Sequence, residues 1–502
     1  MRPSGLQGDQ GLVSVRFPAP EWRKGNGNGE TGVMESTTGT TRALAEFTAG
    51  LTLGRLAPEI VARARFLVLD LIGNIVRARA EAESTPALLA GVRALGLGAG
   101  NAGVFGDAAR YAPAGAALLN GALGHSLDFD DTHAAGCLHP GVTAIAAALA
   151  AGEMEGASGA DVLAGIVAGY EVSCRLALAL PAGEHYARGF HPSATCGAFG
   201  AAAAAARAFR LPAEAVERAF GIALSQTAGS LEFLVNGAWT KRFQVGWSAM
   251  NGLAAACFAR EGFKGAAEAF EGPHGFLRAY APSPTPARAT ERLGEVFELM
   301  ATAVKPYPSC RFGHAGIDAA LALRAEHALR PEEIEAVTLG LSTAGMLLIG
   351  EPAGKKADPR NVVDGQFSGP FVLAASLATG RMGWDSYRLL NDPTVRRLLP
   401  RIMCVHDQAI EAEFPANMSG RVTIRARGTV FERTVRVPKG EPANFLTEAE
   451  LREKFASLAE PVLGAAPAAA LADAALGIAG LANVTALLRK GAPEAPVRLA
   501  GE

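Results

Sequence analysis

The sequence predicts a mainly α-helical protein, in which a large all-helical domain is joined to a smaller α+β domain with an antiparallel sheet. Three observations support this prediction. Apolar residues recur at three-to-four spacing over most of the first 280 residues, as in amphipathic helices. Small residues are abundant while aromatic residues make up only 7% of the chain, which favours closely packed helices over a β-sandwich. Convincing alternation of apolar and polar residues appears only after about residue 290, where it indicates strands.

The chain is predicted to begin with a disordered tail over residues 1–41 and to continue as a helical domain over residues 42–285. The tail is rich in Gly, Ser, Thr and Pro and has no apolar period, which is typical of disorder. From residue 42 the segments TRALAEFTAGLTLGRL and PEIVARARFLVLDLIGNIVRAR, and then several Ala-rich segments, keep the helical spacing. No alternating strand of convincing length interrupts them.

The smaller domain is predicted over residues 290–446. The segment EEIEAVTLGLST at 332–343 ends in strand-like alternation. Residues 409–438 indicate three further strands, AIEAEFP, GRVTIRARG and VFERTVRVP, two of them in a hairpin through Arg427-Gly428. Helical segments lie between the first strand and these three. Residues 447–495 return to helical spacing and are expected to complete the first domain.

Composition argues against several classes of function. The 49 acidic and 47 basic residues nearly cancel, to a net charge of −2, so we expect no nucleic-acid partner. No apolar run is both long and pure enough to span a bilayer, so we expect no association with a membrane. The six cysteines are scattered without a CxxC pair, which signals neither a structural zinc site nor an iron–sulfur cluster. These features predict a cytoplasmic globular protein, most often an enzyme.

The chemically densest stretch is LGHSLDFDDTH at 123–133, which holds three carboxylates and two imidazoles. Its DFDDT run fits the loop of haloacid-dehalogenase-type phosphatases, but that loop follows a buried strand and the residues before it here are helical in pattern. It also fits the DxDDT acid of class II terpene cyclases, whose aromatic walls are poorly matched by four Trp and six Tyr. The simplest alternative is a polar helix end, where Asp and Thr cap the backbone. Residue types alone leave the cap and a functional site equally open.

Two His-Pro pairs favour a functional site. His139-Pro140 and His191-Pro192 each precede a helix of small residues, and Pro is favoured in the first helical turn. Each His is therefore expected at the N-cap or just before it. A helix N-terminus attracts carboxylates and disfavours imidazolium, so both His side chains are expected to be neutral and able to exchange protons.

Two basic segments complete the candidate site. Lys241-Arg242 interrupts a largely apolar stretch, NGAWTKRFQVGWSAMNG, and is either a solvated basic pair or a clamp for substrate carboxylates. The segment KPYPSCRFGHAGIDAAL places Lys305, Arg311 and His314 at the junction into the smaller domain. A junction between domains is a common place for a ligand cleft.

Together these segments resemble the MmgE/PrpD family of 2-methylcitrate dehydratases, which includes cis-aconitate decarboxylases and an iminodisuccinate epimerase. The resemblance extends from about residue 42 to about residue 490. It rests on NGALGHSLDFDDTHAAGCLHPG, HYARGFHPSATCGAFGAAAAAARAF, TKRFQVGWSAMNG, KPYPSCRFGHAGIDAAL and GEPANFLTEAELREKF. It implies an all-helical domain completed by C-terminal helices, a smaller α+β lid domain, a homodimer, and a site between the domains that uses neither metal nor other cofactor.

The motif residues and the two basic segments together define the expected site. Its catalytic residues are expected to be Asp128, His139, His191, Lys241 and Tyr186. Its substrate-binding residues are expected to be Thr132, Arg242, Cys310, Arg311 and His314. Tyr186 is included because a tyrosine just before GFHP suits an epimerase-like proton donor. The chain departs from the animal cis-aconitate decarboxylases at Cys310, where those enzymes have a His, and it has no Tyr near 342–345.

The expected substrate is a small di- or tricarboxylate held by Lys241, Arg311 and the two helix N-termini. His139 is expected to exchange a proton at the carbon α to a carboxylate, with Asp128 orienting it. Dehydration of a 2-methylcitrate-like hydroxy acid is the reaction we expect first. Epimerisation and decarboxylation are the alternatives, because all three reactions pass through one enolate-like species. A non-catalytic carboxylate-binding protein and a metal-dependent hydrolase are the competing hypotheses from other classes.

Overall fold

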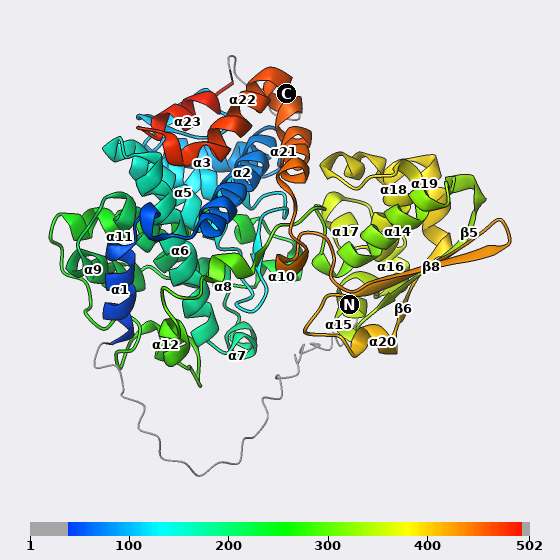
Figure 1. Ribbon diagram of the computed structural model, residues 1–502, viewed down its shortest axis with the longest axis horizontal. Coiled ribbons are helices and arrows are strands. Elements are labelled where there is room, and N and C mark those ends of the chain that lie inside the picture. Colours follow the sequence, from blue (N-terminus) through cyan, green and yellow to red (C-terminus); the bar gives the residue numbers. More distant parts are fainter. Residues whose placement is uncertain (1–38, 494–502) are drawn as a thin grey trace, which may run out of the picture.

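The computed structural model describes residues 39–493, which form two parts joined by a narrow junction (Figure 1). The helical part comprises residues 40–303 and 446–490, and the α+β part comprises residues 307–435; each has its own buried core. Most of the tail predicted over 1–41 lies outside the described residues. Of its last three residues, Thr40 and Thr41 already belong to the first helix.

The helical part contains the helices of the first 290 residues and the last helices of the chain. They are α1 (Thr40–Gly50), α2 (Pro58–Glu81), α3 (Thr85–Ala94), α4 (Pro113–Gly124), α5 (Gly141–Glu155), α6 (Gly159–Ala179), α7 (Ala182–Ala187), α8 (Pro192–Ala208), α9 (Ala213–Leu224), α10 (Phe233–Asn236), α11 (Thr240–Arg260), α12 (Phe276–Tyr280), α13 (Ala287–Thr290), α21 (Glu448–Leu463), α22 (Ala465–Leu476) and α23 (Thr485–Lys490). Two short strand pairs lie among them, β1 (Ala102–Gly103) with β2 (Arg110–Tyr111), and β3 (Thr132–His133) with β4 (Thr302–Ala303).

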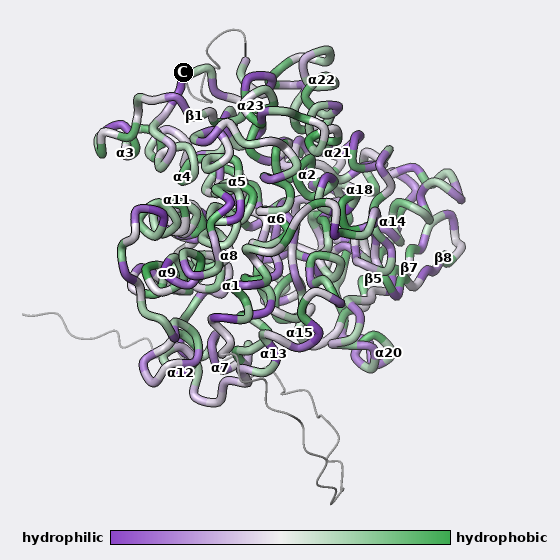
Figure 2. The backbone as a smooth tube through the Cα atoms, turned by 60° about the vertical axis from the view of Figure 1, so that its left-hand side comes forward, coloured by the Kyte–Doolittle hydropathy of each residue, from purple (hydrophilic) through white to green (hydrophobic). Residues whose placement is uncertain are grey.

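Four inner helices, α4, α5, α8 and α11, pack against one another and present the candidate site residues at their ends. Every residue of α8 is buried, and Figure 2 shows hydrophobic residues along these inner helices. Small residues allow their close approach: a Cβ atom at Gly121 of α4 would lie only 3.0 Å from the Cα atom of Gly246 on α11. The abundance of small residues therefore correctly predicted tight helix packing.

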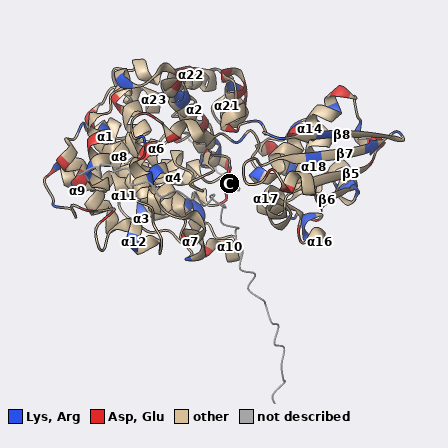
Figure 3. Ribbon diagram, turned by 60° about the horizontal axis from the view of Figure 1, so that its bottom comes forward, with Lys and Arg blue, Asp and Glu red and all other residues tan. Residues whose placement is uncertain are grey.

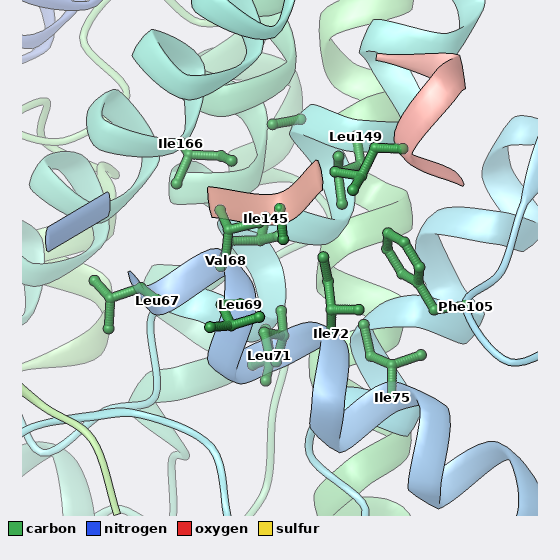
Figure 4. Close-up of a cluster of buried hydrophobic side chains, with 14 of the residues drawn as sticks. Leu67, Val68, Leu69, Leu71, Ile72, Ile75, Phe105, Ile145, Leu149 and Ile166 are labelled. Carbon is green, nitrogen blue, oxygen red and sulfur yellow. The ribbon is translucent and has the colours of Figure 1, made fainter. Parts of the chain in front are cut away.

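The aliphatic face of α2 forms the centre of the main core. Leu67, Leu71, Ile72 and Ile75 of this helix are at most 2% exposed, as is Phe105. Figure 4 shows their side chains meeting those of α5 and α6. The C-terminal helix α21 packs on the same helix α2, so the end of the chain shares a core with its first half.

Helix α6 differs from the sequence expectation about membrane-spanning segments. It is long and apolar enough to cross a membrane by length and composition, although no such run was expected. However, 94% of its apolar window is buried inside the protein. Because it packs against α5 and α8, its apolar character is explained by a position in the centre of the helical part.

The α+β part consists of one four-stranded sheet with helices packed against it. Its elements are α14 (His314–Glu326), β5 (Ile334–Leu341), α15 (Thr343–Gly345), α16 (Ala353–Lys356), α17 (Val362–Gln366), α18 (Gly369–Thr379), a 3₁₀ segment (Trp384–Asn391), α19 (Pro393–Leu398), β6 (Ile402–His406), α20 (Gln408–Glu411), β7 (Gly420–Ala426) and β8 (Thr429–Val435). The strand order is β6-β5-β7-β8. The mainly α fold with a smaller α+β part is thus confirmed.

The sheet confirms the predicted hairpin and corrects two other predictions. Arg427 and Gly428 both have positive φ, 57° and 70°, as a two-residue hairpin turn requires. The sheet is mixed rather than antiparallel, since β6 pairs parallel with β5. The strand predicted from residue 409 is wrong: these residues begin within helix α20 (Gln408–Glu411), because the side chain of Asp407 accepts hydrogen bonds from the N–H groups of Ala409 and Ile410 and caps a helix.

Acidic and basic residues are interspersed over both parts (Figure 3). Ion pairs join the parts where Arg77 and Glu81 of α2 meet Asp385 and Arg388 of the 3₁₀ segment. The indole N–H of Trp384 also donates to Glu81, at 3.0 Å. These contacts fix the α+β part against α2, beside the loop that follows α4.

Candidate active site

The candidate site is assembled by the loop after α4 and by the first turns of α5, α8 and α11. Pairing of β3 with β4 brings the junction segment, with Lys305, against this loop. His191 is the N-cap residue of α8 and His139 directly precedes the N-cap Pro140 of α5, as predicted. The backbone N–H of His139 donates to Ser193 Oγ at 3.0 Å, which ties the two helix starts together.

Asp128 is held between two lysines. Lys241 Nζ, in the first turn of α11, lies 2.6 Å from Oδ1, and Lys305 Nζ lies 3.1 Å from Oδ2. Burial alone would raise the pKa of Asp128, but the two ammonium groups outweigh it and hold the pKa well below its usual range. The residue has a left-handed backbone, with φ 53°, which is uncommon outside Gly, Asn and Asp.

Asp130 orients the imidazole of His139. Its Oδ2 lies 2.8 Å from Nδ1 of His125 and 3.1 Å from Nδ1 of His139. We expected Asp128 to orient His139, but the contact is made by Asp130, because the loop turns the side chain of Asp128 toward the lysines. The approach of Asp130 to Nδ1 of His139 is electrostatic and does not have hydrogen-bond geometry, unlike its contact with His125. It leaves Nε2 of His139 as the nitrogen that can exchange a proton with a substrate.

Asp131 caps helix α5, so the structural alternative is correct for this one carboxylate. It accepts a hydrogen bond from the N–H of Gly141 at 3.2 Å and another from the hydroxyl of Tyr170. Burial raises the pKa of Asp131 to about 8 despite these donors. The start of α5 is therefore already occupied by a carboxyl group of the protein, contrary to the expectation that it would bind the substrate.

Three imidazoles gather above the loop. The ring of His125 lies 4.6 Å from that of His139 and 6.2 Å from that of His191, between centroids. Burial lowers the pKa of His125 to about 4, and burial with neighbouring His125 and Lys241 lowers the pKa of His191 well below its usual value. His191 Nδ1 also lies 2.7 Å from Nε2 of Gln244. His125 and His191 are therefore neutral at physiological pH.

Several buried polar atoms at this site lack a hydrogen-bond partner within the described part of the chain. They are Nδ1 of His139, Nε2 of His125, Oδ1 of Asp130, Oγ1 of Thr132 and Oγ of Ser309. Buried polar groups in folded proteins are almost always paired. Their concentration around one loop indicates a place for a polar ligand, and Thr132, one of the predicted substrate-binding residues, lies among them.

The residues predicted on the junction segment lie near the loop, but they are engaged differently than expected. Arg311 forms an ion pair with both carboxylate oxygens of Glu441, so it is not free to hold a substrate carboxylate. Cys310 is buried and burial raises the pKa of its thiol, which disfavours a reactive thiolate. His314 is buried, and its Nε2 lies 3.2 Å from the carbonyl oxygen of Ser309.

Two further predicted residues lie at the edges of the site. The hydroxyl of Tyr186 donates to the carbonyl oxygen of Cys137 at 3.2 Å, in the loop just before His139. Burial raises the pKa of Tyr186. Arg242 contacts Ser84 Oγ at 3.4 Å; burial lowers its pKa while Asp128 acts in the opposite direction. Within the described residues, neither side chain forms a hydrogen bond with the imidazoles.

Sequence reasoning missed four residues that shape the site: His125, Asp130, Lys305 and Gln244. His125 and Asp130 were visible in the dense motif, but nothing in the spacing distinguishes the carboxylate that faces an imidazole from those that face lysines or a helix end. Lys305 was noted at the junction without a role. Gln244 follows Lys241 by three residues, so it lies on the same side of α11, and this spacing could have identified it.

His125, Asp130 and His139 are also the described residues that could hold a metal ion, because one ligand atom from each lies within 4.8 Å of the others. Two nitrogens and one carboxylate oxygen suit zinc or iron. Ligand atoms about 2.0–2.2 Å from one zinc ion lie about 3.3–3.6 Å apart in tetrahedral geometry, which is wider than the 2.8 Å between His125 and Asp130. The spacing therefore fits a direct hydrogen bond better than a tetrahedral zinc site.

Comparison with known proteins matches both parts of the fold to one family. Residues 42–289 match the MmgE/PrpD N-terminal domain and residues 307–478 match the MmgE/PrpD C-terminal domain. The chain is 29% identical over 413 residues to the cis-aconitate decarboxylase-like protein oryM of Aspergillus oryzae, covering 78% of this chain and 84% of that protein.

Two further relatives carry the name cis-aconitate decarboxylase. The protein of Aspergillus terreus is 25% identical over 475 residues, which is 90% of this chain and 95% of the relative. The mouse protein is 27% identical over 377 residues, which is 70% of this chain and 73% of the relative. These relatives are enzymes, and the similarity extends through both parts of the fold.

Proposed function

The chain belongs to the MmgE/PrpD family, and from this premise we propose that it is a cofactor-independent lyase acting on a small di- or tricarboxylate. The reaction passes through an enolate-like species at the carbon α to a carboxylate. The observation that carries the proposal is the pairing of Asp130 with His139 beside the Lys241–Asp128–Lys305 cluster. An imidazole that can exchange a proton thus lies near two cationic groups.

His139 is proposed as the group that exchanges the carbon-bound proton. The negative charge of Asp130 faces Nδ1, which favours the tautomer with the proton on that nitrogen and stabilises the imidazolium that forms when Nε2 takes up a proton. Such a positioned acid–base group contributes about 10²–10⁴-fold to the rate. Neutral His191, fixed by Gln244, is placed to contact a substrate hydroxyl or carboxylate.

Lys241 and Lys305 are proposed to hold the charge that develops on the substrate. An enolate formed next to a carboxylate carries more negative charge on its oxygens than the substrate, and fixed ammonium groups stabilise it preferentially. The Lys241 side chain is 28% exposed, so it is the cation that a substrate can reach. Arg311 and Lys241 are both ion-paired within the protein, but the Arg311 side chain is only 11% exposed, so Lys241 replaces it as the expected partner of a substrate carboxylate.

Decarboxylation of a cis-aconitate-like tricarboxylate is proposed as the first reaction to test, because the curated relatives carry that name. Loss of CO₂ leaves the electrons of the broken carbon–carbon bond on carbon, from which they delocalise into the alkene and the neighbouring carboxylate. An acid then returns one proton to carbon. This places decarboxylation ahead of the dehydration that we expected from sequence.

Dehydration of a hydroxy acid is the second candidate, and Cys310 is the observation that favours it. This residue stands where the animal cis-aconitate decarboxylases have a His, and its thiol is buried with a raised pKa. A group of this kind is a poor proton donor to carbon. In dehydration, a base instead removes the α-proton while the β-hydroxyl leaves as water with a proton from the site.

Proton NMR in D₂O tests the proposal with cis-aconitate, citrate, 2-methylcitrate, itaconate, tartrate and iminodisuccinate as substrates. Decarboxylation of cis-aconitate would give the methylene signals of a new alkene and deuterium at one carbon. Dehydration of citrate would give a vinylic CH signal, whereas dehydration of 2-methylcitrate would give the signal of a methyl group on a new, fully substituted alkene. Absence of both, and of any α-deuterium exchange with every acid, would contradict the proposed lyase and support a carboxylate-binding protein.

We also propose that the protein works as a homodimer, as the resemblance implies. Five large apolar side chains on α10 and on or just before α11 are between 36% and 77% exposed: Leu234, Val235, Trp239, Phe243 and Trp247. Phe243 and Trp247 also line a surface cavity of about 580 Å³. Adjacent exposed apolar residues of this size commonly mark an interface. Light scattering of the wild-type protein and of Phe243→Glu tests this proposal. A monomeric wild type would contradict the homodimer, and a variant that remains dimeric would contradict the assignment of this surface as the interface.

A further inference from the structure

Three consecutive carbonyl oxygens of the site loop are held by side chains from distant segments, and that of residue 129 accepts additionally from Nδ2 of Asn74 on α2, at 3.3 Å. The carbonyls of residues 127, 128 and 129 accept hydrogen bonds from Gln366 Nε2, Lys305 Nζ and Lys454 Nζ, at 2.9, 2.6 and 2.9 Å respectively. Gln366 ends helix α17, Lys305 lies on the junction segment, and Lys454 lies on α21. Successive carbonyls that all accept from side chains are unusual, since most backbone hydrogen bonds are made to other backbone groups.

The loop needs such support because its conformation is not one that the chain adopts readily. Asp128 has a φ of 53°, in a region that L-residues populate sparsely. Its carboxylate must face Lys241 and Lys305 while Asp130, two residues on, faces the imidazoles. Without external donors the loop would be free to relax, and both orientations would be lost together.

Gln366 is the one of these three donors that crosses from the α+β part to the loop. Lys454 belongs to the helical part, like the loop itself, and Lys305 lies on the junction. The side chain of Gln366 is buried, and its backbone carbonyl accepts the N–H of Cys310 at 2.9 Å. One residue therefore links α17, the junction segment and the loop of Asp128.

We propose that Gln366 is a positioning residue, which makes the geometry of Asp128 depend on docking of the α+β part. When this part is docked, the amide of Gln366 reaches the carbonyl of Leu127 and the Lys–Asp–Lys cluster is complete. When it moves away, the carbonyl of Leu127 loses its donor and the start of the loop is held less firmly. The catalytic consequence rests on the proposed function, whereas the effect on the loop does not.

Two substitutions of Gln366 separate hydrogen bonding from packing. Gln366→Met keeps the length of the side chain and removes the donor. Gln366→Glu keeps both length and polarity, but its carboxylate cannot donate, and only its protonated form can restore the hydrogen bond. Gln408→Glu makes the same chemical change on the exposed start of α20 in the same part of the protein, and it serves as the matched control.

Hydrogen exchange and kinetics are measured on the full-length protein. We expect Gln366→Met to accelerate backbone exchange in residues 125–133 and to lower kcat/KM about 10- to 100-fold, as loss of a donor to a buried carbonyl predicts. For Gln366→Glu, the deficit in kcat/KM relative to wild type should shrink as the pH is lowered from 8 to 5.5. Gln408→Glu should behave as wild type in both measurements.

The proposal would be overturned if folded Gln366→Met exchanged residues 125–133 at the wild-type rate, whatever its activity. It would also be overturned if its kcat/KM stayed within twofold of wild type. If Gln366→Met does not fold, Gln366→Glu provides the test. A deficit in its kcat/KM that stays the same from pH 8 to pH 5.5 would overturn the proposal. If the wild type turned over no carboxylate, the proposed function would fail, while the exchange rates would still decide the role of Gln366.

Discussion

Lys305 Nζ lies 2.6 Å from the backbone carbonyl oxygen of Asp128 and 3.1 Å from its Oδ2. One buried ammonium group thus fixes both the backbone and the carboxylate of Asp128 in the site loop. Because β3 pairs with β4, the short strand before Lys305 is anchored to the end of the same loop. The junction between the two parts is therefore a structural element of the candidate active site.

Replacing Lys305 should destabilise the protein through Asp128. In Lys305→Met the carboxylate keeps only Lys241, and breaking a buried ion pair on one side costs about 3–5 kcal/mol. We expect the midpoint of urea unfolding to fall accordingly. The exposed Lys264→Met is the matched control and should unfold as wild type.

A second substitution tests this explanation. Adding Asp128→Asn to Lys305→Met removes the uncompensated charge, so part of the lost stability should return while activity does not. Equal or lower stability of the double variant would mean that Lys305 acts through packing or through the carbonyl contact alone.

His139 and Asp130 should act as a unit. His139→Ala is expected to lower kcat/KM about 10²–10⁴-fold with the fold retained, and Asp130→Asn to lower it by a comparable factor. If the carboxylate acts only through the imidazole, the double variant should be no worse than His139→Ala, because residues of one catalytic unit are not additive. The exposed His274→Ala is the control and should keep wild-type activity.

Steady-state kinetics of the four proteins in this cycle distinguish the possibilities. Losses that multiply in the double variant would show that Asp130 contributes separately, for example through His125, whose Nδ1 it also contacts. Wild-type activity of His139→Ala would remove His139 from the proposed mechanism.

Asp131 should make stability depend on pH. Its pKa in the folded protein is about 8, against 3.8 for an Asp side chain in the unfolded chain. Between these two pH values the folded state therefore holds a proton that the unfolded chain releases. The bound proton contributes fully to the free energy of unfolding below about pH 4. As the pH rises from about 4 to about 8 this contribution is lost, by about 1.4 kcal/mol for each pH unit.

Asp131→Asn tests this dependence, because it cannot release the proton. Urea midpoints at pH 5 and pH 8 should differ less in the variant than in wild type, whereas the exposed Asp473→Asn should keep the wild-type difference. An unchanged difference in Asp131→Asn would mean that the carboxyl is ionised in the folded state at neutral pH.

Removal of metal should leave the enzyme active. The 2.8 Å contact between His125 and Asp130 fits a hydrogen bond, so we expect substoichiometric metal in purified protein by mass spectrometry and unchanged turnover after exhaustive chelation. Loss of activity on chelation that zinc or iron restores would instead assign His125, Asp130 and His139 as ligands.

The sequence by itself determined the class of fold and the segments of the site. Three-to-four apolar spacing is a local property, and it predicted the helices because each helix buries the stripe that its own sequence defines. His139 and His191 were placed at helix starts by the prolines that follow them, which is also local. The motifs likewise predicted the MmgE/PrpD family, which the comparisons show.

Only the tertiary structure decided which partner each of these groups has. Asp128, Asp130 and Asp131 are alike in type and nearly adjacent in the chain, yet they face two lysines, two imidazoles and a helix end. Their partners come from residues 125–305, and a backbone turn at Asp128 selects among them. Three other features likewise depend on contacts between distant segments, which local spacing cannot encode. They are the parallel pairing of β6 with β5, the ion pair of Arg311 with Glu441, and the hydrogen bond from Gln366 to the loop.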